Sequence, residues 1–183
     1  MKQAICIVSS LMKTKRIGVY WGRFNPPHKG HLRIIKKFKD KYDLVVAIGS
    51  SEHRNEKKNP FSGRERKQMI ESYLKEEKIK DVKVVTLKDG NSKSWAINNL
   101  VKKCRPYVLL LSENHEMINL AKCKKIDVLI FKRKGNLSST MIRDLIASDN
   151  DKWRNLTGKA VARLIVRLNG IERIKTAYQS VRK

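Results

Sequence analysis

The chain has 183 residues, of which 40% are hydrophobic and 32% are charged. This length suits one domain with a proper hydrophobic core, and the composition excludes a disordered chain. The 42 Lys and Arg residues outnumber the 17 Asp and Glu residues, which gives a formal net charge of +25 and favours anionic ligands. Because the basic residues are spread along the whole chain, they also fit solvated helix faces, and we do not expect nucleic acid as the partner.

Cysteine usage and the N-terminal segment indicate a cytoplasmic protein without a membrane partner. Cys6, Cys104 and Cys123 are far apart and form no Cys-x-x-Cys pair, so we expect reduced thiols rather than a disulfide or a metal site. The apolar run near the N-terminus is too short to span a membrane, and no small-residue cleavage site follows it. We interpret residues 1–14 as an N-terminal extension, with Met12 as an alternative start.

Short apolar segments recur along the chain and predict five buried strands, separated by segments with helical periodicity. The predicted strands are residues 16–21, 42–50, 82–87, 107–111 and 127–131. This alternation predicts an α/β fold with a Rossmann-like, doubly wound, parallel five-stranded sheet. In such a sheet the loops after the first, fourth and fifth strands share one ligand-binding crevice. We assign residues 15–150 to this domain and residues 151–183 to a C-terminal helical segment of the same domain, which would serve as a lid or a subunit contact.

The segment 22–31, Gly-Arg-Phe-Asn-Pro-Pro-His-Lys-Gly-His, joins the first strand to the first helix. Proline lacks the N–H that a first helical turn leaves unpaired, so the two prolines fit a helix entry. His28 and His31 lie on one face of that turn, where backbone N–H groups and the helix dipole favour an anion. Arg23 adds a guanidinium, and Gly30 leaves the backbone open to a nucleotide. The segment predicts a polyphosphate site; the alternative is a structural turn with solvated histidines.

A second anion site is predicted where the fifth strand gives way to a helix. Residues 132–136 leave the strand, and Ser138 or Ser139 is the expected N-cap, so that the first helical turn offers its N–H groups. Arg143 follows Thr140 by three residues on the same face and can direct its planar guanidinium at phosphate oxygens that the hydroxyl groups bind. A Ser-Ser-Thr run before a helix is usually only a cap, but its expected place across the crevice from the first anion site favours a shared phosphate site.

Neither the Gly-x-Gly-x-x-Gly of dinucleotide folds nor the Gly-Lys-Ser/Thr of a P-loop is present. The segment 28–31, His-Lys-Gly-His, resembles instead the His-x-Gly-His signature of the nucleotidyltransferase superfamily. Further blocks are similar to the archaeal-type nicotinamide mononucleotide (NMN) adenylyltransferases. These blocks are Ile48-Gly49-Ser50, 59–66 (Asn-Pro-Phe-Ser-Gly-Arg-Glu-Arg), Trp95, 138–143, Trp153-Arg154 and 169–175 (Asn-Gly-Ile-Glu-Arg-Ile-Lys). Asn25, by contrast, stands where the family more often has Gln.

The resemblance implies transfer of AMP from ATP to NMN, which yields NAD and pyrophosphate in NAD biosynthesis. It also implies Mg²⁺ as the cofactor and a homo-oligomer as the assembly. A phosphate nucleophile is already ionised at neutral pH, so this reaction needs no general base, and catalysis can rest on positioning and charge stabilisation. No carboxylate stands out as a protein ligand for the metal, so we expect ATP phosphates and water to hold Mg²⁺.

The resemblance also assigns roles to residues. His28, His31 and Arg143 are the expected catalytic residues. ATP is expected to contact both anion sites, namely Gly22, Arg23, Phe24, His28, Gly30, His31, Ser138, Ser139, Thr140 and Arg143. The expected NMN-binding residues are Trp95, Ser50 and Asn91, with the Trp95 indole stacked on the cationic nicotinamide ring. Packing of Trp95 in the core is the alternative.

The phosphate motifs do not separate NMN from other acceptors, such as flavin mononucleotide or phosphopantetheine, nor ATP from CTP as the donor. They contact only the part that these reactions share. Trp95 and the Asn-Pro-Phe block favour NMN. A function of a different class is also open, because the chain could be a basic nucleic-acid-binding module. Such a module would bind DNA or RNA in a salt-dependent way, and the binding would persist when His28 and His31 are changed. A sensor that binds ATP without turnover is a third hypothesis.

Overall fold

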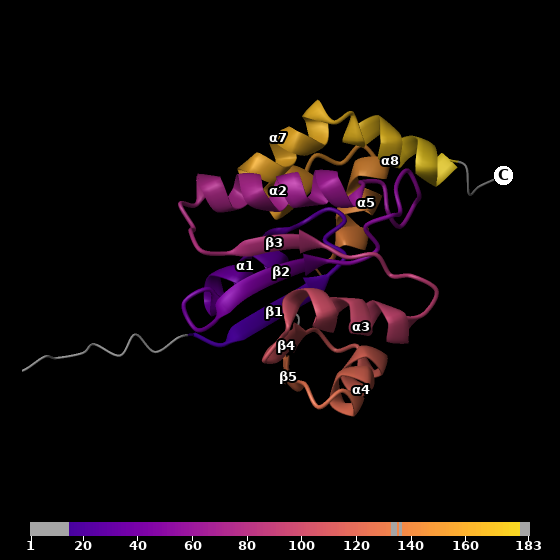
Figure 1. The fold of residues 1–183 in the computed structure, drawn as a ribbon. Coiled ribbons are helices and arrows are strands. Elements are labelled where there is room, and N and C mark those ends of the chain that lie inside the picture. The colour runs from indigo at the N-terminus through magenta and orange to yellow at the C-terminus, as the bar shows by residue number, and fades with distance from the viewer. Residues whose placement is uncertain (1–14, 133–134, 136, 180–183) are drawn as a thin grey trace, which may run out of the picture.

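The computed structural model describes residues 15–132, 135 and 137–179. Its centre is a five-stranded parallel sheet in the order β3-β2-β1-β4-β5 (Figure 1). The strands are β1 Ile17–Gly22, β2 Asp43–Ile48, β3 Lys83–Thr86, β4 Val108–Leu111 and β5 Asp127–Ile130. The chain order reverses between β1 and β4, so the predicted doubly wound, Rossmann-like α/β sheet is confirmed.

The main difference from the predicted strands is at the end of β2, which stops at Ile48 rather than Ser50. Ser50 has a φ of +51°, in the left-handed region that a strand residue does not adopt. The chain therefore turns out of the sheet at Ser50.

Helices cover both faces of the sheet. The helices are α1 Lys29–Phe38, α2 Gly63–Glu76, α3 Lys93–Cys104, α4 His115–Cys123, α5 Ser139–Ala147, α6 Trp153–Leu156, α7 Lys159–Arg167 and α8 Gly170–Gln179. Figure 1 shows α2, α5, α7 and α8 on one side of the sheet and α3 and α4 on the other. Buried side chains of α1 join the core on the α2 side.

The side chains of β2 explain why its sequence is apolar without alternation. Leu44, Val46 and Ile48 belong to the core cluster beneath α1 and α2, while Val45 and Ala47 belong to the cluster beneath α3 and α4. Successive strand residues point to opposite faces, and here both faces are covered. A continuous apolar run is therefore what this central strand requires.

The C-terminal helices are part of the same packed layer. Helix α7 packs against α2, and α8 packs against α5. Trp153, Val161 and Ile174 are buried in the core cluster that also contains residues of α1 and α2. Asn169, with a φ of +52°, forms the turn between α7 and α8. The boundary between residues 15–150 and 151–183 stays a prediction.

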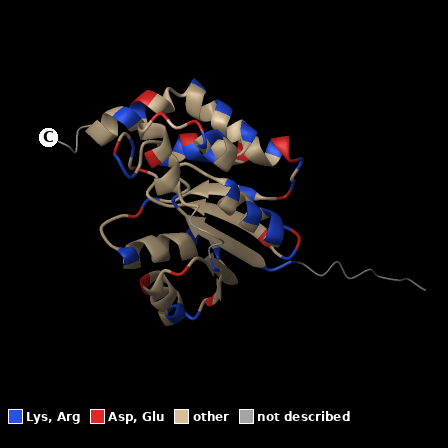
Figure 2. Cartoon of the chain, turned by 180° about the vertical axis from the view of Figure 1, so that it is seen from behind, with Lys and Arg blue, Asp and Glu red and all other residues tan. Residues whose placement is uncertain are grey.

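Some predicted features lie outside the described residues: the extension 1–14 with Cys6 and Met12, and Arg133, Lys134 and Asn136 after β5. In the part of the chain that the structure describes, Cys104 is buried, Cys123 is exposed, and both are free thiols. The same described ranges contain no helix that is long and apolar enough to cross a membrane. Lys and Arg residues are distributed over helices on both sides of the sheet (Figure 2).

Candidate active site

A cleft of about 540 Å³ lies at the carboxyl ends of β1, β4 and β5. Its walls come from the corner after β1, from α1, from the ends of β4 and β5, and from the start of α5, so the loops expected to share a crevice do so. The residues predicted to bind ATP all line this cleft: Gly22, Arg23, Phe24, His28, Gly30, His31, Ser138, Ser139, Thr140 and Arg143.

The two histidines of the corner stack on each other and are held through their Nδ1 atoms. The ring centroids lie 3.7 Å apart, with the planes inclined by 30°. His28 is the N-cap of α1, and its Nδ1 accepts a hydrogen bond from the Gly30 N–H at 3.1 Å. His31 Nδ1 accepts one from the His28 N–H at 3.3 Å. Because an accepting Nδ1 carries no proton, each neutral ring has its proton on Nε2 and can donate through it.

Close packing fixes the shape of this corner. Phe24 has a φ of +52°, and only 1% of the residue is exposed. Its ring meets the His31 ring in a T-shaped contact, with 4.8 Å between the centroids. The Asn25–Pro26 peptide bond is cis. A Cβ at Gly30 would lie 2.9 Å from two atoms of the His28 ring. Gly30 therefore makes room for that ring, a reason for the glycine that the sequence did not predict.

The first turn of α5 stands across the cleft and is bonded to the corner. Ser138 is its N-cap and accepts a hydrogen bond from the Met141 N–H at 3.1 Å, which decides between the two predicted caps. Ser139 instead donates through Oγ to the carbonyl oxygen of Pro26 at 2.9 Å. The helix N-terminus and the histidine corner are thus joined directly.

Arg143 is buried between the same two elements, and only 6% of the residue is exposed. Its Nη1 donates to the Asn25 carbonyl oxygen at 2.8 Å, and its Nη2 donates to Thr140 Oγ1 at 3.1 Å. Burial lowers the pKa of its guanidinium from the ordinary value. Among the described residues, no hydrogen-bond partner reaches its buried Nε. Part of the guanidinium is therefore already engaged by the protein, which the sequence did not predict, and a bound anion would offer an acceptor to the rest.

The predicted NMN-binding residues Trp95, Ser50 and Asn91 do not line this cleft. They lie on or near the loops after β2 and β3. Ser50 is buried and donates through its N–H and Oγ to the two carboxylate oxygens of Asp89, at 2.7 and 2.6 Å. Trp95 is 45% exposed, so the alternative of a core tryptophan is wrong. Its ring lies over Gly90, where a Cβ would come within 2.3 Å of it.

The side chain of Arg66 in α2 binds the loops at the ends of β1 and β2 to each other through hydrogen bonds. It is fully buried and donates to the carbonyl oxygens of Arg23, Gly49 and Ser50 at 2.7 to 2.8 Å. Burial lowers the pKa of its guanidinium to about 10. The carbonyl dipoles thus replace the water that this cation loses on burial.

The sequence indicated no role for Arg66, Asp89 or Asn25. Arg66 did carry a signal, because it occupies the same helical face as the apolar residues Met69 and Ile70, where an arginine needs buried acceptors. The remaining contacts leave no pattern in the sequence, because they form only when distant segments meet. They are the hydrogen bonds of Arg66 and Arg143 to backbone carbonyl groups and those of Ser50 to Asp89.

The cleft is electropositive in composition. Among the residues that the structure describes, its lining contains no Asp or Glu and six cationic side chains, those of Arg23, Arg33, Lys37, Lys58, Lys132 and Arg143. Within the described ranges, no group of three His, Cys, Asp or Glu residues is placed to hold a metal ion. This donor set fits a Mg²⁺ ion only if phosphate oxygens and water supply its ligands.

Comparisons with known proteins agree on the family. The model of the cytidylyltransferase-like family matches residues 19–145. The chain is 34% identical over 164 residues to the nicotinamide-nucleotide adenylyltransferase of Methanospirillum hungatei, a match that covers 88% of this chain and 93% of that protein. It is 30% identical over 167 residues to the nicotinamide-nucleotide adenylyltransferase of Pyrobaculum arsenaticum, covering 87% of this chain and 93% of that protein.

The fold agrees as well. A bifunctional NMN adenylyltransferase/ADP ribose pyrophosphatase from Francisella tularensis superposes with a TM-score of 0.71 and 22% identity. The match covers 92% of this chain and 54% of that chain, so this chain spans about half the length of the bifunctional protein. The matched segment 19–145 contains both the histidine corner and the first turn of α5. The chain belongs to the cytidylyltransferase-like family of nucleotidyltransferases and, within it, to the nicotinamide-nucleotide adenylyltransferases.

Proposed function

We propose that this protein transfers the adenylyl group of ATP to the phosphate of NMN and so forms NAD and pyrophosphate. The relatives that cover most of the chain carry the name of this activity. One observation carries the proposal: two stacked histidines, each able to donate through Nε2, share a cleft with the N-terminus of α5 and Arg143. Such a cleft offers donors on both sides of a polyphosphate.

The chemistry is an exchange of one phosphorus–oxygen bond for another. An oxygen of the NMN phosphate attacks the α-phosphorus of ATP and forms the new bond. The bond from the α-phosphorus to the oxygen that bridges to the β-phosphate breaks, and its electron pair leaves with pyrophosphate. The attacking phosphate is already ionised, so no side chain has to remove a proton. The protein's part is to hold the two phosphates in line and to stabilise the charge that develops.

The two anion sites divide this work. We assign His31 to the α-phosphate and to the bridging oxygen of the leaving group, with His28 and Arg23 on neighbouring phosphate oxygens. Ser139, Thr140 and Arg143 hold the β- and γ-phosphates. In this assignment the Nδ1 bonds of His28 and His31 to the backbone fix the rings so that Nε2 is the donor. Gly22, Phe24, Gly30 and Ser138 shape the two anion sites.

The acceptor is assigned to the loops after β2 and β3. The exposed Asn91 offers its side-chain amide to NMN. The Ser50 hydroxyl, whose proton goes to Asp89, offers its oxygen as an acceptor. The exposed indole of Trp95 offers a flat face to a cationic ring. The loop after β2 adjoins the end of β1, where the Gly49 N–H donates to the Gly22 carbonyl oxygen at 3.0 Å, and it adjoins the end of β3, where the Ser51 N–H donates to the Leu87 carbonyl oxygen at 3.1 Å.

Mg²⁺ accompanies ATP in this proposal. When bound, it neutralises phosphate charge and draws its ligands from phosphate oxygens and water. We also propose a cytoplasmic location, which the unpaired cysteines support, and a homo-oligomeric assembly, which only the resemblance supports.

The test is pyrophosphate release by the purified protein with Mg²⁺ and ATP, offering NMN, its nicotinate analogue, flavin mononucleotide and phosphopantetheine separately, with CTP as a second donor. Rapid release with NMN, and NAD as the product, is the expected result. Release with another acceptor alone would keep the reaction and refute the role of Trp95. No release with any acceptor would refute the proposal and favour a binding module.

A further inference from the structure

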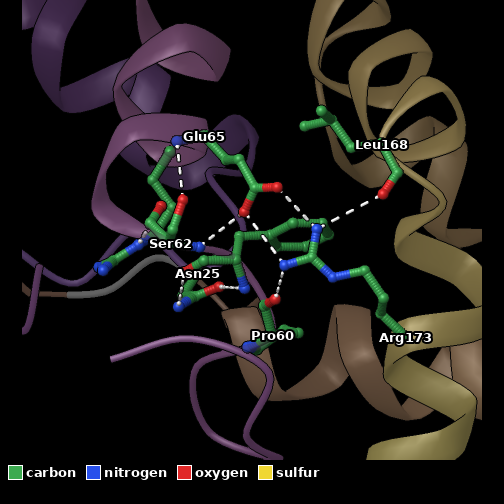
Figure 3. A network of polar contacts seen from close by, with 8 residues as sticks. Asn25, Pro60, Ser62, Glu65, Leu168 and Arg173 are labelled. Carbon is green, nitrogen blue, oxygen red and sulfur yellow. Dashed lines mark hydrogen bonds and ion pairs between the residues drawn. The ribbon is translucent and has the colours of Figure 1, made fainter. Parts of the chain in front are cut away.

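Two segments far apart in the chain, 59–66 and 169–175, meet in the structure through one side chain (Figure 3). Arg173 of α8 donates to both carboxylate oxygens of Glu65, at 2.7 and 3.1 Å. Its Nη2 also donates to the carbonyl oxygen of Pro60. Its guanidinium carbon lies 5.3 Å from the centroid of the Phe61 ring. Neither segment contacts the reacting phosphates in the proposed function, so this junction needs another explanation.

The junction fixes α8 and the start of α2 to each other. Glu65 completes the capping box of α2, since its carboxylate also accepts the Ser62 N–H at 2.8 Å. Arg173 and Glu65 have side chains that are 23% and 22% exposed, so their pair is partly buried and is screened less by salt than a surface pair. At Gly170, a Cβ would lie 2.6 Å from the Phe61 ring. The N-terminal end of α8 is therefore packed directly on Phe61.

Phe61 passes this contact on to the phosphate corner. The Asn25 side chain exchanges two hydrogen bonds with the Phe61 backbone, both 3.1 Å long, and its Nδ2 also reaches Asn59 Oδ1 at 3.4 Å. Asn25 is 1% exposed, so no water competes for these bonds. The Asn25 carbonyl oxygen is the group to which Arg143 donates. A continuous series of contacts thus runs from Arg173 through Phe61 and Asn25 to Arg143.

We propose that Arg173 is a positioning residue: by holding the segment 59–61 it fixes Asn25, and through Asn25 it fixes Arg143 and the corner that receives the phosphates of ATP. The inference rests on the proposed function for its effect on turnover, but not for its effect on the binding of ATP. A shift of about 1 Å in such a group costs up to about 100-fold in rate. Arg173 itself does not line the cleft.

The test compares Arg173→Gln with Arg163→Gln. Arg163 is a matched control, because it also joins a C-terminal helix to a glutamate of α2, Glu76, at 2.8 Å. Its side chain is 69% exposed, and among the described residues it makes no hydrogen bond or ion pair with the corner. We expect Arg173→Gln to weaken the binding of a non-hydrolysable ATP analogue, measured by calorimetry, and to lower kcat by about 10-fold. Arg163→Gln should leave both within about two-fold. Arg173→Lys, which keeps the charge but not the planar fork, should restore only part of the loss.

A double-mutant cycle separates positioning from mere stability. If Arg173 acts through Asn25, Arg173→Gln should have little further effect on analogue binding or kcat once Asn25→Ala is present. Melting temperatures identify a working temperature at which all variants are folded. The proposal is overturned if Arg173→Gln lowers only the melting temperature, or if its effects multiply fully with those of Asn25→Ala. If the wild-type protein binds the analogue but transfers no adenylyl group, the proposed function fails while the binding cycle still decides this inference.

Discussion

Arg143 Nη1 donates a hydrogen bond of 2.8 Å to the carbonyl oxygen of Asn25, although 118 positions separate the two residues in the chain. The bond joins the N-terminal end of α5 to the histidine corner through groups of the protein alone. Donors that are fixed in advance spend no reorganisation energy when charge develops in a reaction. Arg143 therefore supports the corner, and in the proposed function it is also the cation that faces the phosphates.

Arg143→Lys should separate these roles. Lysine keeps the charge but cannot donate to Asn25 and Thr140 while it faces a phosphate, because it lacks the planar fork. We expect kcat to fall by about 100-fold while the protein stays folded. Pyrophosphate release and a thermal unfolding scan measure the two quantities. Arg167→Lys, an exposed change on α7, is the control, and equal activity of the two variants would contradict the role of Arg143.

His31→Asn tests the assignment of Nε2 as the donor to the α-phosphate. An Asn side-chain oxygen can accept the His28 N–H that His31 Nδ1 accepts now, so the cap of α1 should survive. The Nε2 donor is lost, and we expect kcat to fall by about 10² to 10³-fold with a much smaller change in the affinity for ATP. Steady-state kinetics and calorimetry with an ATP analogue measure the split. Near-normal turnover would show that the imidazole has no part in the reaction.

The sequence was sufficient for the parts of the site that local patterns encode. The apolar strand of residues 44–48, the histidine spacing and the Thr-x-x-Arg arrangement at α5 are local, and the fold places them as expected. Arg66 and Asn25 could not be assigned in this way. Their partners are backbone carbonyl and N–H groups of distant loops, which every residue possesses, so no residue type marks the partner.

Glu65 should make stability depend on pH through its pair with Arg173. Burial raises the pKa of Glu65, but the hydrogen bond and charge of Arg173 and the Ser62 N–H outweigh it and hold the pKa below its ordinary value. A carboxyl group whose pKa is lowered by folding stabilises the protein above the unfolded-state pKa, near about 4.3. This contribution is lost as the pH falls through the folded-state value.

We therefore expect the difference in the free energy of unfolding between wild type and Glu65→Gln to be largest at neutral pH and to shrink below about pH 4.5. Urea unfolding at a series of pH values measures it. Glu113→Gln, at an exposed position after β4, is the comparison, because its difference from wild type should stay small throughout. A difference for Glu65→Gln that is the same at pH 7 and at low pH would refute the coupling.

The cationic lining of the cleft should attract its polyanionic substrates from a distance. Arg33 and Lys37 are exposed residues of α1, one turn apart, and extend the lining beyond the histidines. Positive charges around a cleft raise the local concentration and the association rate of an anion, and salt screens this effect over about 8 Å at physiological ionic strength.

The double variant Arg33→Glu/Lys37→Glu should lower kcat/KM for ATP by about 10-fold at low salt, with a smaller effect on kcat. The loss should diminish as salt is added. Lys102→Glu/Lys122→Glu places the same charge change on α3 and α4, across the sheet from α1. If both double variants respond equally, the net charge of +25 acts as a whole, and the residues beside the cleft have no special part in capturing ATP.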